Sequence, residues 1–309
     1  MKILVDETHN PRGRIFSNYT ELRRLLERNG HEIDIYDDFP IKFESLSDAD
    51  VFILPCCDGS KLYGYEINAL LRYVELGHGL FVISHAGGDG GLGTNMNQLT
   101  SSHFDITLQS NQVFDEIHCD QEMPKQIIIR DFVDHPITQG LEQICFVAGC
   151  SLKIGKKAIP LVRSDADANP SNSPLIAIWE GGKDKNGHVA VSGSYRMFSD
   201  YGAGIKKFEN EQFTLNIFEW LGNCLKAPKS AIISKASASA QREPEISPTS
   251  QEPIIGSISS KRKQKRSPSS SSVQLKPTSE TLSNKKHSIN EKKSISGTQE
   301  TRLDESNAI

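Results

Sequence analysis

The sequence predicts an α/β domain with a doubly wound, mostly parallel sheet, followed by a disordered C-terminal tail. In the first 226 residues, short apolar runs alternate with amphipathic segments of helical period, as strands alternate with crossover helices. Residues 227–309 contain 20 serines and no phenylalanine, tyrosine, tryptophan or cysteine. Such a segment cannot bury enough apolar surface to offset the entropy of ordering. We therefore predict a domain over 1–226 and a tail over 227–309.

The first half of the domain reads as strands and helices in alternation. Lys2–Asp6 is a short apolar strand at the start of the chain. We place the N-cap of the next helix at Asn18, because Glu21 stands three residues later at the capping-box position. A second helix, Glu66–Glu75, carries its apolar residues on one face. The other strands predicted here are Glu32–Tyr36, Val51–Leu54 and Leu80–Ser84.

The second half is richer in strands and closes with a helix from Glu209 to Leu221. Two glycine-containing turns between Trp179 and Val189 predict a hairpin. The predicted strands are Gln126–Ile129, Ile144–Ala148, Pro160–Arg163, Leu175–Trp179 and His188–Ser192.

Charge divides the chain in the same way. The formal net charge is −4, but the tail alone carries +6 and the first 226 residues carry −10. An acidic domain is a poor nucleic-acid binder, so we expect nucleic acid at the tail if anywhere. The tail has a basic run that can serve as a localisation signal, a phosphorylation-gated patch or a tether to an anionic surface; the alternative is a solvated linker. The run consists of Lys261, Arg262, Lys263, Lys265 and Arg266.

Neither membrane insertion nor secretion is predicted. No apolar run approaches the roughly 20 residues that span a bilayer, and Met1-Lys2 leads directly into a strand instead of a signal peptide. The six cysteines are scattered, without a Cys-x-x-Cys pair. We therefore expect reduced thiols, no transmembrane segment and a cytoplasmic location.

A glycine-rich corner follows the strand Leu80–Ser84. In α/β proteins, this kind of strand-to-helix corner often holds a nucleophile or a phosphate-binding turn. Residues 88–93 match Gly-x-Gly-x-x-Gly, but a dinucleotide site would follow the first strand instead of the fourth. No Gly-Lys-Ser/Thr is present, so the corner is not a P-loop. We predict no cofactor; the loop's backbone N–H groups can still hold an anion at the following helix.

Four stretches, in order along the domain, carry a resemblance to a known family. They are Ile3–His9, the corner with Leu80–Ser84, Gly87-Gly88 and Gly93–Leu99, then Asp134–Gly140, and finally Asn210–Trp220. Together they resemble the GIFT domain, which is shared by gliding-motility GldG proteins and a subunit of the intraflagellar transport B complex. The resemblance implies a flavodoxin-like, class I glutamine-amidotransferase-like sandwich. Such relatives generally lack the amidotransferase's catalytic residues and act as protein-interaction or sugar-type binding modules.

The catalytic groups of an amidotransferase are missing from the matching positions. Its cysteine would stand just after Leu80–Ser84, where this chain has His85-Ala86, and no His-x-Glu pair occurs. Cys56-Cys57 replaces the Pro-Gly-Gly turn that would donate N–H groups to an oxyanion. Because a side chain disfavours positive φ, we expect no preformed oxyanion hole. Without a nucleophile and base, covalent acyl transfer has no route, and no catalytic residue is predicted.

A ligand site remains possible at the carboxyl ends of the strands. Asp6, His9 and His85 would form it, as in a hydrolase or carbohydrate-binding protein of the ThuA-like branch of the superfold. The alternative is that Asp6 and His9 bond the loop backbone while His85 braces the glycine turn. Convergence of the three side chains within about 4 Å around an open pocket would favour an enzyme. The candidate ligand-binding residues are Asp6, His9, Ser84, His85, Gly87, Gly88, Thr94 and Asn95; no metal site is predicted.

The sequence therefore favours a non-catalytic binding module. We expect it to dock onto protein partners in a transport, motility or membrane-associated assembly, with a small-molecule ligand as a further option. The alternative function is a ThuA-like hydrolase or carbohydrate-binding protein that uses the His/Asp site.

Overall fold

The computed structural model describes residues 1–181, 187–202 and 204–223. The predicted tail with its basic run, the turn of the predicted hairpin (182–186) and the predicted boundary at 226/227 lie outside the described residues. In the part that is described, no helix is both long and apolar enough to cross a membrane.

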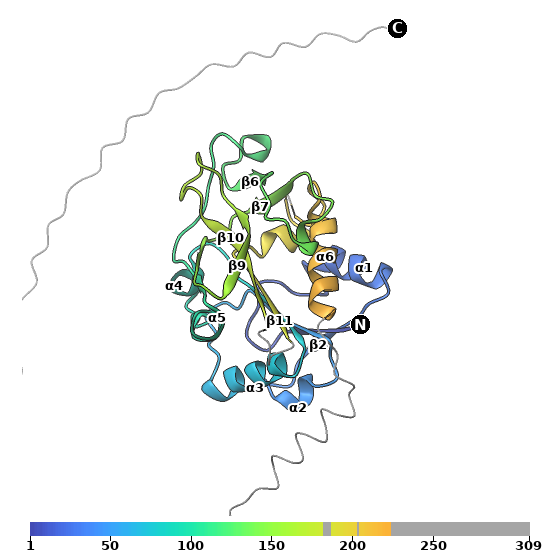
Figure 1. Ribbon diagram of the computed structural model, residues 1–309. Coiled ribbons are helices and arrows are strands. Elements are labelled where there is room, and N and C mark those ends of the chain that lie inside the picture. Colours follow the sequence, from blue (N-terminus) through green and yellow to red (C-terminus); the bar gives the residue numbers. More distant parts are fainter. Residues whose placement is uncertain (182–186, 203, 224–309) are drawn as a thin grey trace, which may run out of the picture. The chain divides into compact units, whose positions relative to one another are not determined.

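A seven-stranded sheet forms the centre of the domain, in the order β2-β1-β3-β4-β11-β10-β9. Its strands β2, β11, β10 and β9 are labelled in Figure 1. β2, β1, β3, β4 and β11 pair in parallel, and β10 is antiparallel to both of its neighbours. The predicted doubly wound, mostly parallel sheet is thus confirmed. The strands are β1 (Lys2–Asp6), β2 (Glu32–Tyr36), β3 (Val51–Pro55), β4 (Gly79–Ile83), β9 (Ala158–Arg163), β10 (Pro174–Glu180) and β11 (His188–Ser192).

Two small antiparallel pairs accompany the central sheet. β5 (Ile106–Leu108) pairs with β8 (Leu152–Ile154), and β6 (Gln126–Ile129) pairs with β7 (Ile144–Val147). The α-helices are α1 (Thr20–Arg28), α2 (Phe43–Leu46), α3 (Gly64–Glu75), α4 (Gly88–Leu92), α5 (Asn97–Phe104) and α6 (Asn210–Gly222), and 3₁₀ turns cover Asp120–Glu122, Pro136–Thr138 and Arg196–Phe198.

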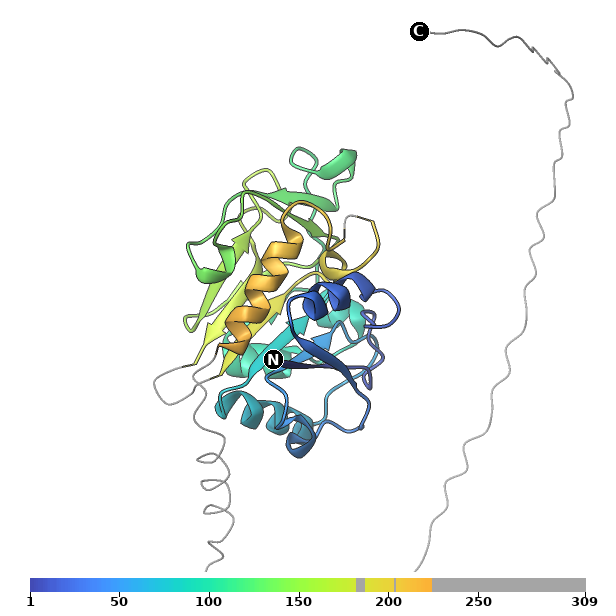
Figure 2. The same ribbon diagram turned by 90° about the vertical axis from the view of Figure 1, so that its right-hand side faces the viewer.

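Helices cover both faces of the central sheet (Figure 2). Alternate residues of a strand point to opposite faces, so Ile3 and Val5 of β1 pack with α1 and α6, whereas Leu4 packs with α3. The inner strands β1, β3 and β4 are buried on both faces and therefore read as continuous apolar runs, whereas the edge strand β2 alternates exposed and partly buried residues.

The start of α1 corrects one prediction. The N-cap position is occupied by Tyr19 instead of Asn18, and no side chain at that position caps the helix. The Asp200 carboxylate accepts hydrogen bonds from the backbone N–H groups of Thr20 (3.0 Å) and Glu21 (2.9 Å). The Asn18 side chain instead bonds the preceding loop, accepting from the Arg14 N–H at 2.7 Å. A residue far along the chain therefore caps this helix.

The strand order reverses direction between β1 and β3. From β1 the chain winds outward to β2 at the sheet edge, and from β3 it winds the other way to β4. In open α/β sheets this switch point leaves a crevice at the carboxyl ends of the strands, where ligands bind. Here the residues that follow β1 and β3 fill that region.

Candidate functional site

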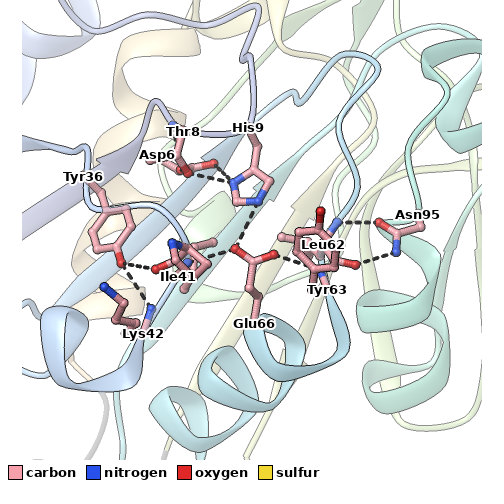
Figure 3. Close-up of polar contacts among 11 residues, drawn as sticks. Asp6, Thr8, His9, Tyr36, Ile41, Lys42, Leu62, Tyr63, Glu66 and Asn95 are labelled. Atoms are coloured by element: carbon pink, nitrogen blue, oxygen red, sulfur yellow. Dashed lines mark hydrogen bonds and ion pairs between the residues drawn. The ribbon is translucent and has the colours of Figure 1, made fainter.

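A buried histidine between two carboxylates lies beyond the end of β1 (Figure 3). Asp6 ends that strand, His9 follows three residues later, and Glu66 stands in the first turn of α3. The side chains of Asp6 and Glu66 are fully buried, and His9 is 2% exposed. Buried charged groups are retained only when paired and hydrogen-bonded, so their mutual contacts decide what the cluster can do.

Each imidazole nitrogen of His9 faces a carboxylate. The His9 Nδ1 is 2.9 Å from Asp6 Oδ2, and Nε2 is 3.3 Å from Glu66 Oε1. The first contact is a hydrogen bond, while the second is an ion-pair contact without hydrogen-bond geometry. Thr8 in turn holds the Asp6 carboxylate, because its backbone N–H and its hydroxyl donate to Asp6 Oδ1 at 3.0 Å and 2.6 Å.

Glu66 joins three segments of the chain. Its Oε1 accepts from the Ile41 N–H at 2.8 Å, and its Oε2 accepts from the Tyr63 N–H at 2.8 Å, the residue that caps α3. Asn95 lies beside this point and forms two hydrogen bonds with the backbone of Leu62, at 2.8 and 2.9 Å (Figure 3). The network therefore connects the loop after β1, the loop before α2 and the start of α3.

The surroundings of His9 favour its charged form. Burial by itself lowers the pKa of His9, but the hydrogen bond to Asp6 and the negative charges of Asp6 and Glu66 together outweigh it. The pKa is consequently raised above its ordinary value of 6.5. The outer side of the imidazole is covered by the Phe39 ring, whose centroid is 5.8 Å from that of His9. Asp6, His9 and Glu66 therefore form a buried cluster joined by a hydrogen bond and an ion-pair contact.

His85 takes no part in this network. No hydrogen bond or ion pair joins it to Asp6 or His9 in the residues described, and its ring packs edge-on against Tyr195 at a centroid distance of 4.9 Å. Burial, followed by the positive charges of Arg12 and Arg196, lowers the pKa of His85 to about 4. The structure thus brings Asp6 and His9 together and leaves His85 apart.

The glycine-rich corner is shaped by backbone conformation. Gly87 and Gly88 both have positive φ, at 94° and 49°. At Gly88 a Cβ would also lie only 2.5 Å from the Gln109 carbonyl oxygen. Only glycine satisfies both conditions without strain, so these residues build the turn through their lack of a side chain.

The chain itself caps the helix after the corner. Asp89 accepts from the Met96 N–H at 2.9 Å and the Asn97 N–H at 2.7 Å, so its carboxylate occupies the N-terminal end of α5. The Thr94 hydroxyl donates to the same carboxylate at 2.6 Å. The Asp89 carboxylate therefore occupies the backbone N–H groups that could otherwise bind an anion from solution.

The turn after β3 departs from the expected backbone. We predicted that a side chain at Cys56 would disfavour positive φ, yet Cys56 has φ of 61°. Its N–H donates to the Leu54 carbonyl at 3.1 Å, and its carbonyl accepts from the Arg12 N–H at 2.9 Å. These bonds hold the left-handed conformation, and they also use the Cys56 N–H internally. Burial raises the pKa of the Cys56 and Cys57 thiols, so neither is an activated nucleophile.

Ser84, the remaining candidate, is buried at the end of β4. It adjoins the Cys150 thiol, whose pKa is raised to about 12 by burial, an effect that the Ser84 hydroxyl partly opposes. Sequence reasoning missed Glu66, because a glutamate in the first turn of a helix is most often exposed. The available signal was its capping-box spacing from Tyr63, which places the carboxylate at the helix start but says nothing of burial.

Comparisons with known proteins agree with the fold described above. A model of the IFT52 GIFT domain matches residues 133–226. The intraflagellar transport protein 52 homolog of Homo sapiens is 23% identical in an alignment of 225 residues, which covers 66% of this chain and 50% of that protein. The solved structure named "mmIFT52 N-terminal domain" superposes with a TM-score of 0.66 at 22% identity, covering 72% of this chain and 98% of that one. The domain is thus similar to the GIFT domain in sequence and in fold.

Two further relatives agree with this assignment. The Mus musculus homolog of intraflagellar transport protein 52 is 24% identical over 181 residues, covering 52% of this chain and 42% of that protein. A cytoplasmic protein from Salmonella typhimurium superposes with a TM-score of 0.51 at 16% identity, covering 71% and 98%, and shares the fold. The resemblance to the GIFT domain is confirmed. The chain spans half or less of the length of these curated relatives.

Proposed function

We propose that the GIFT domain of this chain is a non-catalytic scaffold module that docks onto protein partners in an intraflagellar-transport-type assembly. The observation that carries the proposal is the internal use of the carboxylates near the strand ends. His9 is enclosed by Asp6 and Glu66, and Asp89 caps α5. A substrate would have to break these hydrogen bonds and ion pairs before it could contact the side chains that form them. The relatives named for intraflagellar transport support the same conclusion.

An exposed group of aromatic side chains above the His9 network suits protein binding. Phe39, Tyr63 and Tyr65 are each more than half exposed. Tyr63 stacks on Tyr65 at 5.4 Å between ring centroids and meets Phe39 edge-on at 6.4 Å. Aromatic residues are enriched in protein interfaces because they offer large contact area at low entropic cost. We call these three residues the aromatic surface.

Affinity purification from ciliated cells tests the proposal. The full chain, residues 1–226 and the Phe39→Ala/Tyr65→Ala variant are each expressed with the same tag. We expect intraflagellar transport subunits to co-purify with the first two and to be depleted with the third. Phe16→Ala is the matched control, because Phe16 is equally exposed but lies against Arg23 of α1. Absence of these subunits from the full-chain sample would refute the proposal, and their loss from residues 1–226 would assign docking to the tail.

The alternative, a hydrolase or carbohydrate-binding protein using Asp6 and His9, is favoured by one observation. Asp6 holds the Nδ1 side of His9 as a carboxylate holds the imidazole of a general base. Turnover of ester or glycoside substrates by the full chain that disappears in His9→Asn would support this alternative. Equal, background-level rates for both proteins would exclude it for those substrates. A cytoplasmic location is part of our proposal and is tested by imaging the tagged full chain.

A further inference from the structure

A second cluster of ionisable side chains lies in two loops of the strand-rich half. Asp115 and His118 follow β5, and Asp165 follows β9. One candidate ligand atom from each lies within 4.8 Å of the others. We propose that Asp115, His118 and Asp165 form a site for a divalent transition-metal ion of the Zn²⁺ type. The proposal is independent of the docking function above, and it departs from our sequence-based expectation of no metal.

The distances within the cluster are close to those of a metal site. The His118 Nδ1 is 2.8 Å from Asp165 Oδ2 and 3.7 Å from Asp115 Oδ2. A tetrahedral Zn²⁺ with bonds of about 2.0–2.2 Å holds its ligand atoms roughly 3.4 Å apart. All three atoms lie within 4.8 Å of one another, so side-chain movements of about 1 Å would bring them onto one ion.

The backbone of both loops orients the two carboxylates in the same way. Asp115 Oδ1 accepts from the N–H groups of Ile117 (2.7 Å) and His118 (2.8 Å). Asp165 Oδ1 likewise accepts from Asp167 and Ala168, both at 3.1 Å. Each aspartate thus keeps its Oδ2 for the cluster.

A backbone bridge holds the two loops in register. Phe114 and Asn169 exchange two backbone hydrogen bonds, at 3.1 and 2.8 Å. The His118 carbonyl also accepts from the Ile128 N–H of β6 at 2.9 Å. Ligands carried by loops bind a metal well only when those loops are fixed beforehand, and these bonds meet that condition.

The decisive observation is the state of Asp115. Its side chain is 1% exposed, and the Oδ2 atom is buried without a hydrogen-bond partner in the structure as described. A buried carboxylate oxygen without a partner is costly, and native proteins normally satisfy such atoms. A cation bound between Asp115, His118 and Asp165 would satisfy it. His118 and Asp165 are partly exposed, so an ion can enter from solvent.

The ligand set selects the class of metal. One imidazole nitrogen and two carboxylate oxygens suit Zn²⁺ and related transition metals, whereas Ca²⁺ and Mg²⁺ prefer oxygen ligands throughout. Three protein ligands leave the fourth position to water. The bound ion would link the two loops and stabilise the domain by binding only the folded state.

Calorimetry with Zn²⁺ alone tests the site. The full chain is stripped with a chelator and titrated with zinc sulfate, and we expect one ion per chain. Asp115→Asn, His118→Gln and Asp165→Asn should each weaken binding by at least about 10-fold. The asparagine variants keep the oxygen that bonds the loop backbone, and circular dichroism verifies their fold. His118→Gln changes a partly exposed side chain and provides a second readout if an asparagine variant unfolds.

Two control variants separate this site from incidental binding. His103→Gln removes an exposed histidine on α5, and Cys119→Ser removes the partly exposed thiol next to His118; both should bind Zn²⁺ as the unmodified chain does. Absence of binding by the full chain, or binding that persists in all three ligand variants, would overturn the proposal. Loss of binding in Cys119→Ser would show that the ligand set is wrong. Co²⁺ absorption provides a second measurement of the coordination.

Discussion

The substitution Glu66→Gln tests whether the His9 network stabilises the fold as its geometry implies. In the native chain, the fully buried carboxylate accepts from the N–H groups of Ile41 and Tyr63 and faces His9. An amide of nearly the same shape has only one oxygen. Whichever way it turns, its NH₂ group must therefore face one of the two N–H donors.

The expected loss of stability follows from these contacts. A hydrogen bond to a charged group contributes about 1.5–3 kcal/mol, and a buried donor left unsatisfied costs about 1–3 kcal/mol. Breaking a buried ion pair from one side typically costs about 3–5 kcal/mol. Because these terms share the same atoms, they do not add, and we expect Glu66→Gln to lower the free energy of unfolding by about 3 kcal/mol.

The effect should also depend on pH. The raised pKa of His9 in the folded state means that its contribution is fully present below the unfolded value of 6.5 and is lost as pH rises through the folded value. Since Glu66 is one cause of the raised pKa, the difference between the native chain and Glu66→Gln should be larger at pH 6 than at pH 8.5.

Urea denaturation followed by tryptophan fluorescence provides the measurement, because Trp179 and Trp220 are both buried. Glu44→Gln is the matched control: Glu44 is 78% exposed and lies 3.8 Å from Arg72, so its loss should change stability by less than about 0.5 kcal/mol. A loss below about 1 kcal/mol for Glu66→Gln at pH 6 would refute the reasoning, and so would a loss equal to that of the control.

Three further substitutions test other parts of the structure. With a folded pKa of about 4, His85 contributes stability that is present above pH 6.5 and lost as pH falls toward 4. The full pKa shift corresponds to about 3 kcal/mol, which solvent screening reduces to about 1–2 kcal/mol. Denaturation curves of His85→Asn should therefore lack this loss of stability at acid pH. Asp200→Ala removes the cap of α1 and should cost about 1–2 kcal/mol, against no measurable change for the exposed Asp131→Ala. Gly88→Ala combines positive φ with a backbone clash and should cost more than about 2 kcal/mol, whereas Gly30→Ala, at positive φ in open space, should cost about 1 kcal/mol; equal melting temperatures for the two would contradict the assigned clash.

The strand positions could be predicted from the sequence because burial of a strand requires apolar residues at its buried positions. β1, β2 and β11 begin and end at the predicted residues, and α6 is displaced by one residue at each end. β1 and β11 lie inside the central sheet, where burial on both faces requires a run of apolar residues, and the edge strand β2 shows instead the alternation of a half-buried strand. The short helices α2 and α4 were missed because they have too few turns to show a periodic pattern.

Contacts between distant residues could not be predicted in the same way. Asp200 caps α1 from 180 residues away, and no local pattern near either residue indicates the pairing. The sequence placed Asp6 and His9 at the strand ends, but their partner Glu66 belongs to another element. Its burial depends on the loop that carries Phe39 and Ile41. The sequence alone therefore indicates Asp6 and His9 but not their partner Glu66.

The two ionisable clusters differ in how their buried carboxylates are satisfied. In the His9 network, both carboxylate oxygens of Glu66 accept a backbone N–H, and Asp6 bonds both Thr8 and His9. Among the described residues, His9 Nε2 has no hydrogen-bond partner, but it faces Glu66 Oε1 at 3.3 Å as an ion pair. The carboxylates of this network are thus satisfied where α/β sheets usually bind a ligand. Asp115, by contrast, has a buried oxygen without a hydrogen-bond partner in the part of the chain that is described, and this atom lies 3.7 Å from His118 Nδ1. A cation adds most stability where the fold leaves a buried carboxylate oxygen unsatisfied, so the search for a bound cation belongs at Asp115.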